Sequence, residues 1–197
     1  MKRALPVIFL LLFKLCNAQL LDSLSLDTMR GYTSLEDARA NADKVVKLTL
    51  TKHKLTEFPA EIRKFKNLQY LDLSKNKIKD VPEWIGELTS LQKLVLSHND
   101  IDTLPPQIGL LVNLKYFIMN RDPLNLLPNA IGGLTELRYL DMWGDNIGYF
   151  PSEISKLTKL KSFDLRDILI SDDEQATLKG YLPHAVFFFS PSCSCKD

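Results

Sequence analysis

The stretch L-Q-Y-L-D-L-S-K-N-K-I-K-D-V-P-E-W-I-G-E-L-T-S, from Leu68 to Ser90, is followed directly by a second stretch of the same pattern. That stretch reads L-Q-K-L-V-L-S-H-N-D-I-D-T-L-P-P-Q-I-G-L-L-V-N, from Leu91 to Asn113. This 23-residue unit recurs six times without a gap, and its copies open at Val45, Leu68, Leu91, Leu114, Leu137 and Leu160. A repeat of fixed period predicts a solenoid in which stacked copies share one core.

Each copy contains a short strand, a turn and a return segment. Leu71 and Leu73 alternate with Asp72, which predicts a strand with one buried face. Asn76 then falls where the chain turns, and its amide can bond backbone groups that the sheet leaves unpaired. After Pro82 the apolar spacing predicts a helical or 3₁₀ turn on the outer side. Glycine in this return segment leaves room for close backbone contact, at Gly86, Gly109 and Gly132.

The copies match L-x-x-L-x-L-x-x-N-x-L and continue as L-P-x-x-I-G-x-L, so the chain resembles the leucine-rich repeat family from Val45 to about Ile170. The resemblance implies an α/β repeat solenoid: a horseshoe segment with a parallel, concave β-sheet. It leaves function open, because one fold hosts many functions.

The residue at the turn-asparagine position differs among the copies. In chain order it is His53, Asn76, Asn99, Asp122, Asp145 and Ile168. An ionised aspartate cannot donate a hydrogen bond. We therefore expect the turns after Met119 and Met142 to be looser than their neighbours. The sixth copy lacks the proline and is expected to be a degenerate terminal unit.

The first residues have the pattern of a cleavable signal peptide. Lys2 and Arg3 precede the apolar run Ala4–Phe13, and Ala18 closes a cleavage site before Gln19. Two alternatives are a buried N-terminal strand or helix and a lipid-modified Cys16. The run is shorter than the roughly 20 apolar residues of a membrane span. The pattern therefore favours export, to the outside or to the cell envelope.

The charge balance argues against a nucleic-acid partner. Removing Lys2, Arg3 and Lys14 from the 25 basic residues leaves 22 against 24 acidic residues, a net charge of −2. Nucleic-acid binding needs a strongly basic surface. No sequence pattern indicates a cofactor, and no phosphate-binding glycine loop occurs.

Both ends of the array carry the sequence features of caps, which solenoids need. Ser34, with Asp37 three residues later, predicts a short helix over the first copy, and S-D-D-E from Ser171 predicts a capping box. The second helix should end near Gly180, and A-V-F-F-F then predicts a final strand. The expected organisation is a signal peptide (1–18), an N-terminal segment with its capping helix (19–44), six repeats (45–170) and a C-terminal helix-strand cap (171–197). Together these features resemble small secreted bacterial leucine-rich repeat proteins.

Candidate chemistry is sparse. Export would allow a disulfide between Cys193 and Cys195, although residues two apart in the chain form a small, strained ring. Free thiols are the alternative. Zinc needs about four ligands, which these two cysteines and a distant His184 do not supply. Asp141 and Asp164 should be neighbours about 5 Å apart, but a solvated sheet face is the simpler interpretation. We expect no enzymatic activity.

The concave face carries the main functional prediction. Strand alternation points the third, fifth and seventh residues of each copy away from the core. An apolar and aromatic group therefore collects near the middle of the sheet, formed by Tyr70, Val95, Tyr116, Ile118, Tyr139 and Trp143. Aromatic side chains on a rigid surface are common binding anchors. The alternative is that cross-strand tyrosines only stabilise the sheet.

The sequence thus predicts a secreted, monomeric, non-enzymatic module that binds a protein or peptide through its concave sheet. Carbohydrate is the second ligand class, because tyrosine and tryptophan faces beside carboxylates suit sugar rings. A structural protein of the cell envelope that associates with itself is the remaining alternative.

Overall fold

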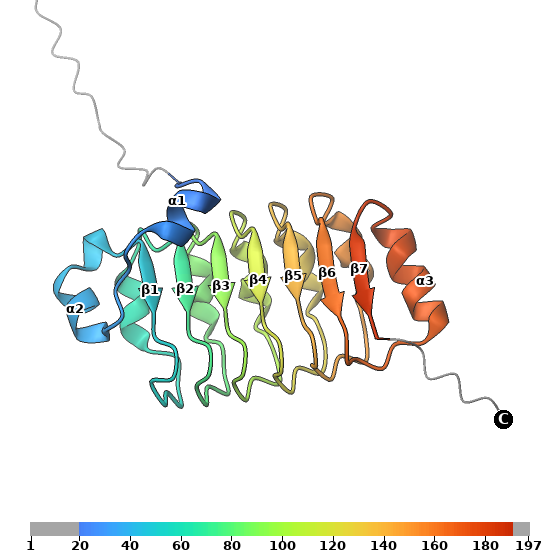
Figure 1. Ribbon diagram of the computed structural model, residues 1–197, viewed down its shortest axis with the longest axis horizontal. Helices are drawn as coiled ribbons and strands as arrows, with labels where there is room; N and C mark the ends of the chain where they lie inside the picture. Colours follow the sequence, from blue (N-terminus) through green and yellow to red (C-terminus); the bar gives the residue numbers. More distant parts are fainter. Residues whose placement is uncertain (1–19, 191–197) are drawn as a thin grey trace, which may run out of the picture.

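Within residues 20–190, seven short parallel strands form one sheet, in the same order as in the chain. The computed structural model describes residues 20–190 (Figure 1). The strands are β1 (Lys47–Thr49), β2 (Tyr70–Asp72), β3 (Lys93–Val95), β4 (Tyr116–Ile118), β5 (Tyr139–Asp141), β6 (Ser162–Leu165) and β7 (Val186–Phe189). The expected signal peptide, Cys16, Cys193 and Cys195 lie outside the described residues. The predicted repeat register and parallel sheet are confirmed, since each strand pairs with the residues one repeat away.

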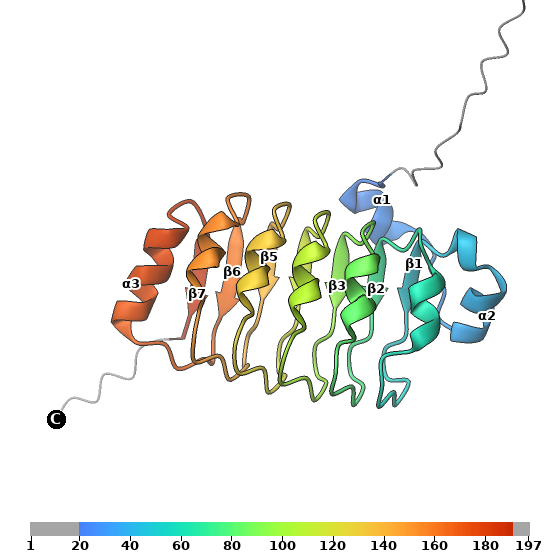
Figure 2. The same cartoon turned by 180° about the vertical axis from the view of Figure 1, so that it is seen from behind.

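The return segments form 3₁₀ helices on the far side of the sheet (Figure 2). They are η2 (Ala60–Lys64), η3 (Glu83–Glu87), η4 (Pro106–Leu110), η5 (Asn129–Gly133) and η6 (Ser152–Lys156). A proline holds the N-cap position of all five, because its fixed φ suits a helix start and the missing N–H is not needed there. The predicted helical or 3₁₀ turn is therefore confirmed.

A continuous core lies between the sheet and the 3₁₀ helices. The central residue of each repeat strand is almost fully buried: Leu48, Leu71, Leu94, Phe117, Leu140 and Phe163. Isoleucines from the 3₁₀ helices face them, such as Ile85 and Ile108. The core runs through every repeat without interruption, as expected of units that cannot bury their leucines alone.

Glycine allows neighbouring 3₁₀ helices to approach closely. A Cβ atom built on Gly109 would lie 2.2 Å from the carbonyl oxygen of Ala130, and one on Gly132 would lie 2.6 Å from that of Glu153. Both distances are shorter than van der Waals contact, so a larger residue would push the helices apart. The prediction of close backbone contact at these glycines is confirmed.

The turn asparagines connect successive repeats. Asn76 Nδ2 donates to the carbonyls of Leu50 (2.9 Å) and Leu73 (2.8 Å), while its Oδ1 accepts from Leu55 N (3.1 Å). Asn99 repeats this arrangement one unit later, with Nδ2 donating to Leu73 and Oδ1 accepting from Ile78 N. Each amide therefore satisfies buried backbone groups on two repeats.

The expectation of looser turns after Met119 and Met142 is wrong for the backbone. Arg121 N donates to Trp143 O and Gly144 N donates to Arg166 O, both at 2.9 Å, continuing the hydrogen bonds of earlier repeats. The carboxylates of Asp122 and Asp145 accept backbone N–H bonds and are buried. The difference lies in the side chains, because one oxygen of each carboxylate has no hydrogen-bond partner.

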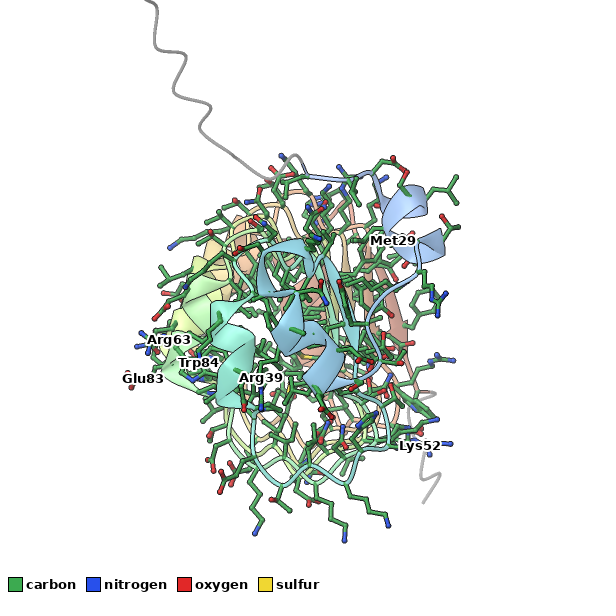
Figure 3. The ribbon with its side chains drawn as sticks, turned by 90° about the vertical axis from the view of Figure 1, so that its left-hand side faces the viewer. Met29, Arg39, Lys52, Arg63, Glu83 and Trp84 are labelled. Carbon is green, nitrogen blue, oxygen red and sulfur yellow. The ribbon has the colours of Figure 1, made fainter. Side chains whose placement is uncertain are left out.

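From residue 20 onward, helices α1 and α2 precede the repeats, after which the chain passes through η1 (Ala42–Lys44) into β1. In α2 (Leu35–Ala40), Ser34 Oγ accepts from Asp37 N and Ala38 is fully buried against the core, which confirms the predicted cap. The sequence did not predict α1 (Ser23–Thr28), whose N-cap is Asp22. Seen from the N-terminal end, α1 and Met29 lie on the sheet side, opposite the 3₁₀ helices that carry Arg63 and Trp84 (Figure 3).

The C-terminal cap has the predicted order of helix and strand. Helix α3 (Asp172–Tyr181) begins with the capping box between Ser171 and Glu174 and ends one residue beyond Gly180. β7 pairs with β6, and Phe187 and Phe189 turn toward the core, as the alternation predicted. Phe187 packs on Phe163 with ring centroids 5.8 Å apart, which closes the end of the core.

Candidate binding surface

The candidate surface is the sheet face, defined here as the face of the sheet turned away from the core. Its first component is a cation–aromatic row formed by Lys47, Tyr70, Lys93, Tyr116 and Tyr139, the third residues of five successive repeats. Lys93 Nζ lies 5.1 Å from the ring centroid of Tyr70 and 5.6 Å from that of Tyr116. Tyr116 and Tyr139 stack with centroids 5.1 Å apart. The row is therefore a continuous, ordered line of side chains across β1 to β5.

Val95 and Ile118 form a small apolar patch beside this row. They are register partners on β3 and β4, and both are half-buried. Three of the six predicted residues, Tyr70, Tyr116 and Tyr139, lie in the row, and these two lie next to it. The register thus brings five of the six predicted residues together.

Trp143 lies apart from that group, near the turn that follows β5. Its ring packs under the guanidinium of Arg121 at 4.1 Å, and its Nε1 donates to Asp167 at 2.7 Å. Tyr139 precedes it by four residues, about 13 Å along an extended chain. Trp143 is thus held between the repeats before and after its own, and it extends the candidate surface toward β6.

The exposed part of the sheet face lies at its C-terminal end. Tyr139 is 43% exposed, and on β7 Val186 and Phe188 are 57% and 45% exposed. Arg166 lies over the ring of Phe188 at 5.9 Å and forms an ion pair with Asp164. Exposed apolar side chains grouped with arginine are typical of interaction surfaces.

Helix α1 lies along the edge of the sheet face where the first strands begin, and it contacts the first residues of β1, β3 and β4 (Figure 1). Leu26 of α1 is 3% exposed, and Tyr116 donates to Ser23 at 3.4 Å. Lys93 Nζ forms an ion pair with Asp27 at 2.8 Å. Tyr116 therefore contacts the chain's own N-terminal segment, so the six predicted residues do not form one open surface.

Sequence reasoning missed the glutamines that contact this segment. Gln69 and Gln92 are the second residues of adjacent repeats, both almost fully buried, and each bonds the backbone of Leu21. Two signals were present: the same polar residue at one position of successive copies, and the helix-start pattern D-S-L-S from Asp22. Neither reveals that the two segments meet, because Leu21 and Gln92 lie 71 residues apart in the chain.

Asp141 and Asp164, the fifth residues of the fifth and sixth repeats, form hydrogen bonds and ion pairs within the sheet face. Asp141 and Asp164 are register partners, as predicted. Asp141 accepts from Asn120 Nδ2 (2.8 Å) and from Trp143 N (3.2 Å), whereas Asp164 binds Arg166. These bonds engage both groups as hydrogen-bond acceptors. Across residues 20–190, no three His, Cys, Asp or Glu side chains gather into a group that could hold a metal ion.

Burial and neighbouring charges shift the pKa values of Tyr70 and His98 on this side of the molecule. Burial, together with the charges of Asp72 and Asp27, raises the pKa of Tyr70 to about 12. Its hydroxyl therefore stays neutral at physiological pH. Burial, with the positive charges of Arg121 and Lys75, lowers the pKa of His98.

This architecture defines a repeat protein of the leucine-rich class, and the comparison with family profiles agrees. The profile described as leucine-rich repeat region matches residues 44–177, so the chain belongs to the leucine-rich repeat family. Members of this family are generally non-catalytic binding scaffolds. No curated protein sequence matches the chain.

Solved structures of bacterial and plant leucine-rich repeat proteins are similar to this chain. A leucine-rich repeat protein of Leptospira interrogans is 32% identical with a TM-score of 0.69, and the match covers 75% of this chain and 38% of that one. An internalin of Listeria monocytogenes, InlF, shares the fold at 19% identity and a TM-score of 0.65, over 79% and 45% of the two chains.

A plant peptide hormone receptor, RGFR1, solved in complex with RGF2, is 28% identical with a TM-score of 0.64. That match covers 76% of this chain and 25% of the receptor. This chain therefore spans less than half the length of each of these three proteins. Among residues 20–190, no helix is long and apolar enough to cross a membrane.

Proposed function

We propose that this chain is an exported, non-enzymatic binding module that recognises a protein or peptide through its concave sheet face. The observation that carries the proposal is the exposed aromatic and apolar surface over β5 to β7, with Tyr139, Val186 and Phe188 beside Arg166. Parallel strands and a continuous core hold these side chains in place. Binding a partner would therefore cost little conformational entropy at this surface.

A peptide partner is supported by two further observations. A receptor with the same repeat fold is a peptide hormone receptor, and the sheet face of this chain holds a peptide segment of its own, residues 21–27. A carbohydrate ligand is less well supported, because Arg121 packs on one face of the Trp143 ring and Asp167 accepts the hydrogen bond of its Nε1. A sugar array probed with the mature protein separates these two ligand classes.

The first test replaces Trp143 with alanine and measures affinity for a protein partner captured from the native source. If Trp143 is a binding anchor, the variant should lose at least about 2 kcal/mol of binding free energy. Its thermal stability should fall much less, since an outward side chain leaves no core cavity.

Lys161→Ala is the matched control, because Lys161 is exposed outside the aromatic group and its loss should leave affinity unchanged. Full affinity in Trp143→Ala would move the binding site to another surface. A collapse in stability without a specific loss of affinity would instead mean that the aromatic residues only stabilise the sheet.

Export is part of the proposal and has its own test. The basic start, the apolar run to Phe13 and Ala18 support cleavage before Gln19. Intact-mass analysis of the protein recovered from outside the cytoplasm should give a chain that begins at Gln19. A mass that retains Met1 to Ala18 would contradict export with cleavage, and a mass consistent with acylated Cys16 would indicate lipid anchoring instead.

A further inference from the structure

Two buried amide side chains, those of Gln69 and Gln92, form hydrogen bonds with the backbone of Leu21. Gln69 Oε1 accepts from Leu21 N at 2.8 Å, and Gln92 Nε2 donates to Leu21 O at 3.0 Å. Gln92 Nε2 also donates to Gln69 Oε1 at 2.8 Å, so the two side chains position one another. This pair binds both the backbone donor and the backbone acceptor of one residue. It is a peptide-backbone clamp.

Two lysines of the cation–aromatic row bind the other end of the same segment. Lys47 Nζ donates to the carbonyls of Leu26 (3.1 Å) and Asp27 (2.7 Å), near the end of α1, where a cation is favourable. Lys93 Nζ binds the Asp27 carboxylate at 2.8 Å. Between the clamp and the lysines, Leu26 is buried. The site thus combines backbone recognition, an apolar anchor and an acid-binding end.

The repeat array has a separate cap and does not need α1 to close its core. Helix α2 covers the first repeat, with Ala38 fully buried in the core cluster, whereas Leu26 lies outside that cluster. Helix α1 is only six residues long and leaves Leu24 74% exposed. Three residues, Met29 to Gly31, connect it to Tyr32, which bridges to β1. Because of this arrangement, α1 can leave the sheet face while the core stays closed.

We propose that the N-terminal half of the sheet face is a peptide-binding site, occupied in the free protein by residues 21–27 and taken over by a partner peptide of the same chemistry. That peptide offers one extended residue to the glutamine clamp, a leucine to the apolar position and a carboxylate to Lys93. The inference rests on the proposed function and gives it a ligand class, an acidic peptide with a leucine anchor. The charge of Lys47 and Lys93 complements such a peptide.

The tethered segment is a strong competitor. A short linker keeps it at a millimolar effective concentration, so an external peptide should bind the wild-type chain weakly. Weakening the segment's own contacts should open the site. The test therefore uses the full mature chain with Leu26→Ser and Asp27→Lys, which removes the apolar anchor and reverses the carboxylate. The probe is a fluorescent synthetic peptide of residues 20–30, L-L-D-S-L-S-L-D-T-M-R.

We expect the probe to bind the double variant at least 10-fold more tightly than the wild-type chain, and a scrambled probe not to bind. Combining Leu26→Ser with Lys93→Asp instead, so that the retained Asp27 is repelled, should abolish binding of the natural probe and restore binding of a probe with lysine in place of Asp27. Lys161→Asp, the matched charge reversal outside the site, should change neither affinity. Circular dichroism melts establish that each variant is folded.

Equal probe affinity for the wild-type chain and the double variant would overturn the proposal, as would affinity that is indifferent to Lys93→Asp. If Lys93→Asp prevents folding, the chain that carries Asp27→Lys alone tests the same charge contact from its other partner. The natural probe should bind that variant more tightly than it binds the wild-type chain. A wild-type dimer in light scattering that Asp27→Lys dissociates would assign the site to a second copy of this chain and contradict a separate partner.

Failure of this site is distinguishable from failure of the proposed function. If the probe does not bind but Trp143→Ala still weakens the captured partner, the C-terminal half of the sheet face is the binding surface and only the peptide site is wrong. If the probe binds and Trp143→Ala has no effect, the peptide site stands and Trp143 is not an anchor.

Discussion

At the scale of single residues, the turn position distinguishes the repeats most clearly. Asn76 and Asn99 use their amide nitrogens to bond carbonyls of two repeats, whereas Asp122 and Asp145 leave one buried oxygen each without a partner. Burial raises the pKa of Asp122 to about 7 and that of Asp145 to about 8, with the neighbouring charge of Asp122 adding to the second. A protonated aspartate resembles an asparagine because it can donate one hydrogen bond.

The raised pKa values predict that Asp145→Asn stabilises the protein increasingly as pH rises. The folded pKa lies above the ordinary value of 3.8, so the stability linked to the protonated form is present below pH 3.8 and is lost as pH rises toward about 8. Asparagine has no such loss. The gain over wild type should be small at pH 4 and reach at least about 1 kcal/mol at pH 8.

Urea unfolding at several pH values measures this difference. Asp80→Asn, at an exposed position, is the control and should show little change. A gain that is the same at pH 4 and pH 8 would mean that Asp145 is ionised in the folded protein throughout this range.

The aspartates also mark a limit of sequence reasoning at this scale. The sequence shows that Asp122 and Asp145 replace an amide, and it predicts that their turns are therefore looser. It could not predict that the backbone keeps the same hydrogen bonds, because the parallel ladder of neighbouring repeats holds each turn in place whatever its side chain. A similar effect forces non-glycine residues after the strands into left-handed conformation, such as Lys75 and His98 with φ of 58°.

At the scale of elements, contact between adjacent 3₁₀ helices sets the spacing of the stack. Gly109→Ala should destabilise the protein by about 1–3 kcal/mol, since the added methyl group meets the Ala130 carbonyl and neither helix can yield without moving its own neighbour. Gly148→Ala is the matched control, because its Cβ would have nothing within 4 Å. Thermal unfolding of the two variants checks the prediction, and equal stability would show that the stack relaxes freely around Gly109.

The elements themselves were largely predictable from the repeat. The period located every repeat strand, the L-P-x-x-I-G pattern located the 3₁₀ helices, and S-D-D-E located α3. Helix α1 was missed because its position depends on Gln69, Gln92 and Lys93, which are distant in the chain, and not on any periodic signal. For the same reason the sequence indicated which side chains share the sheet face, but not that part of this face is already occupied.

At the scale of the whole molecule, the sheet face and the 3₁₀ face divide the surface between two roles. The 3₁₀ face carries ion pairs between successive repeats, such as Arg63 with Glu87 at 2.5 Å, which are exposed and individually weak. The sheet face carries the aromatic side chains, α1 and the exposed apolar end at β7. This division favours the sheet face as the surface that recognises a partner.

The two tryptophans of the chain report on these two faces. Trp143 lies on the sheet face, and Trp84 lies in η3 on the opposite side (Figure 3). Hydroxyl-radical footprinting of the mature protein, free and bound to its captured partner, measures the oxidation rate of each ring by mass spectrometry. If the sheet face binds the partner, binding should slow oxidation of Trp143 and leave that of Trp84 unchanged. Protection of Trp84 with no change at Trp143 would contradict recognition by the sheet face.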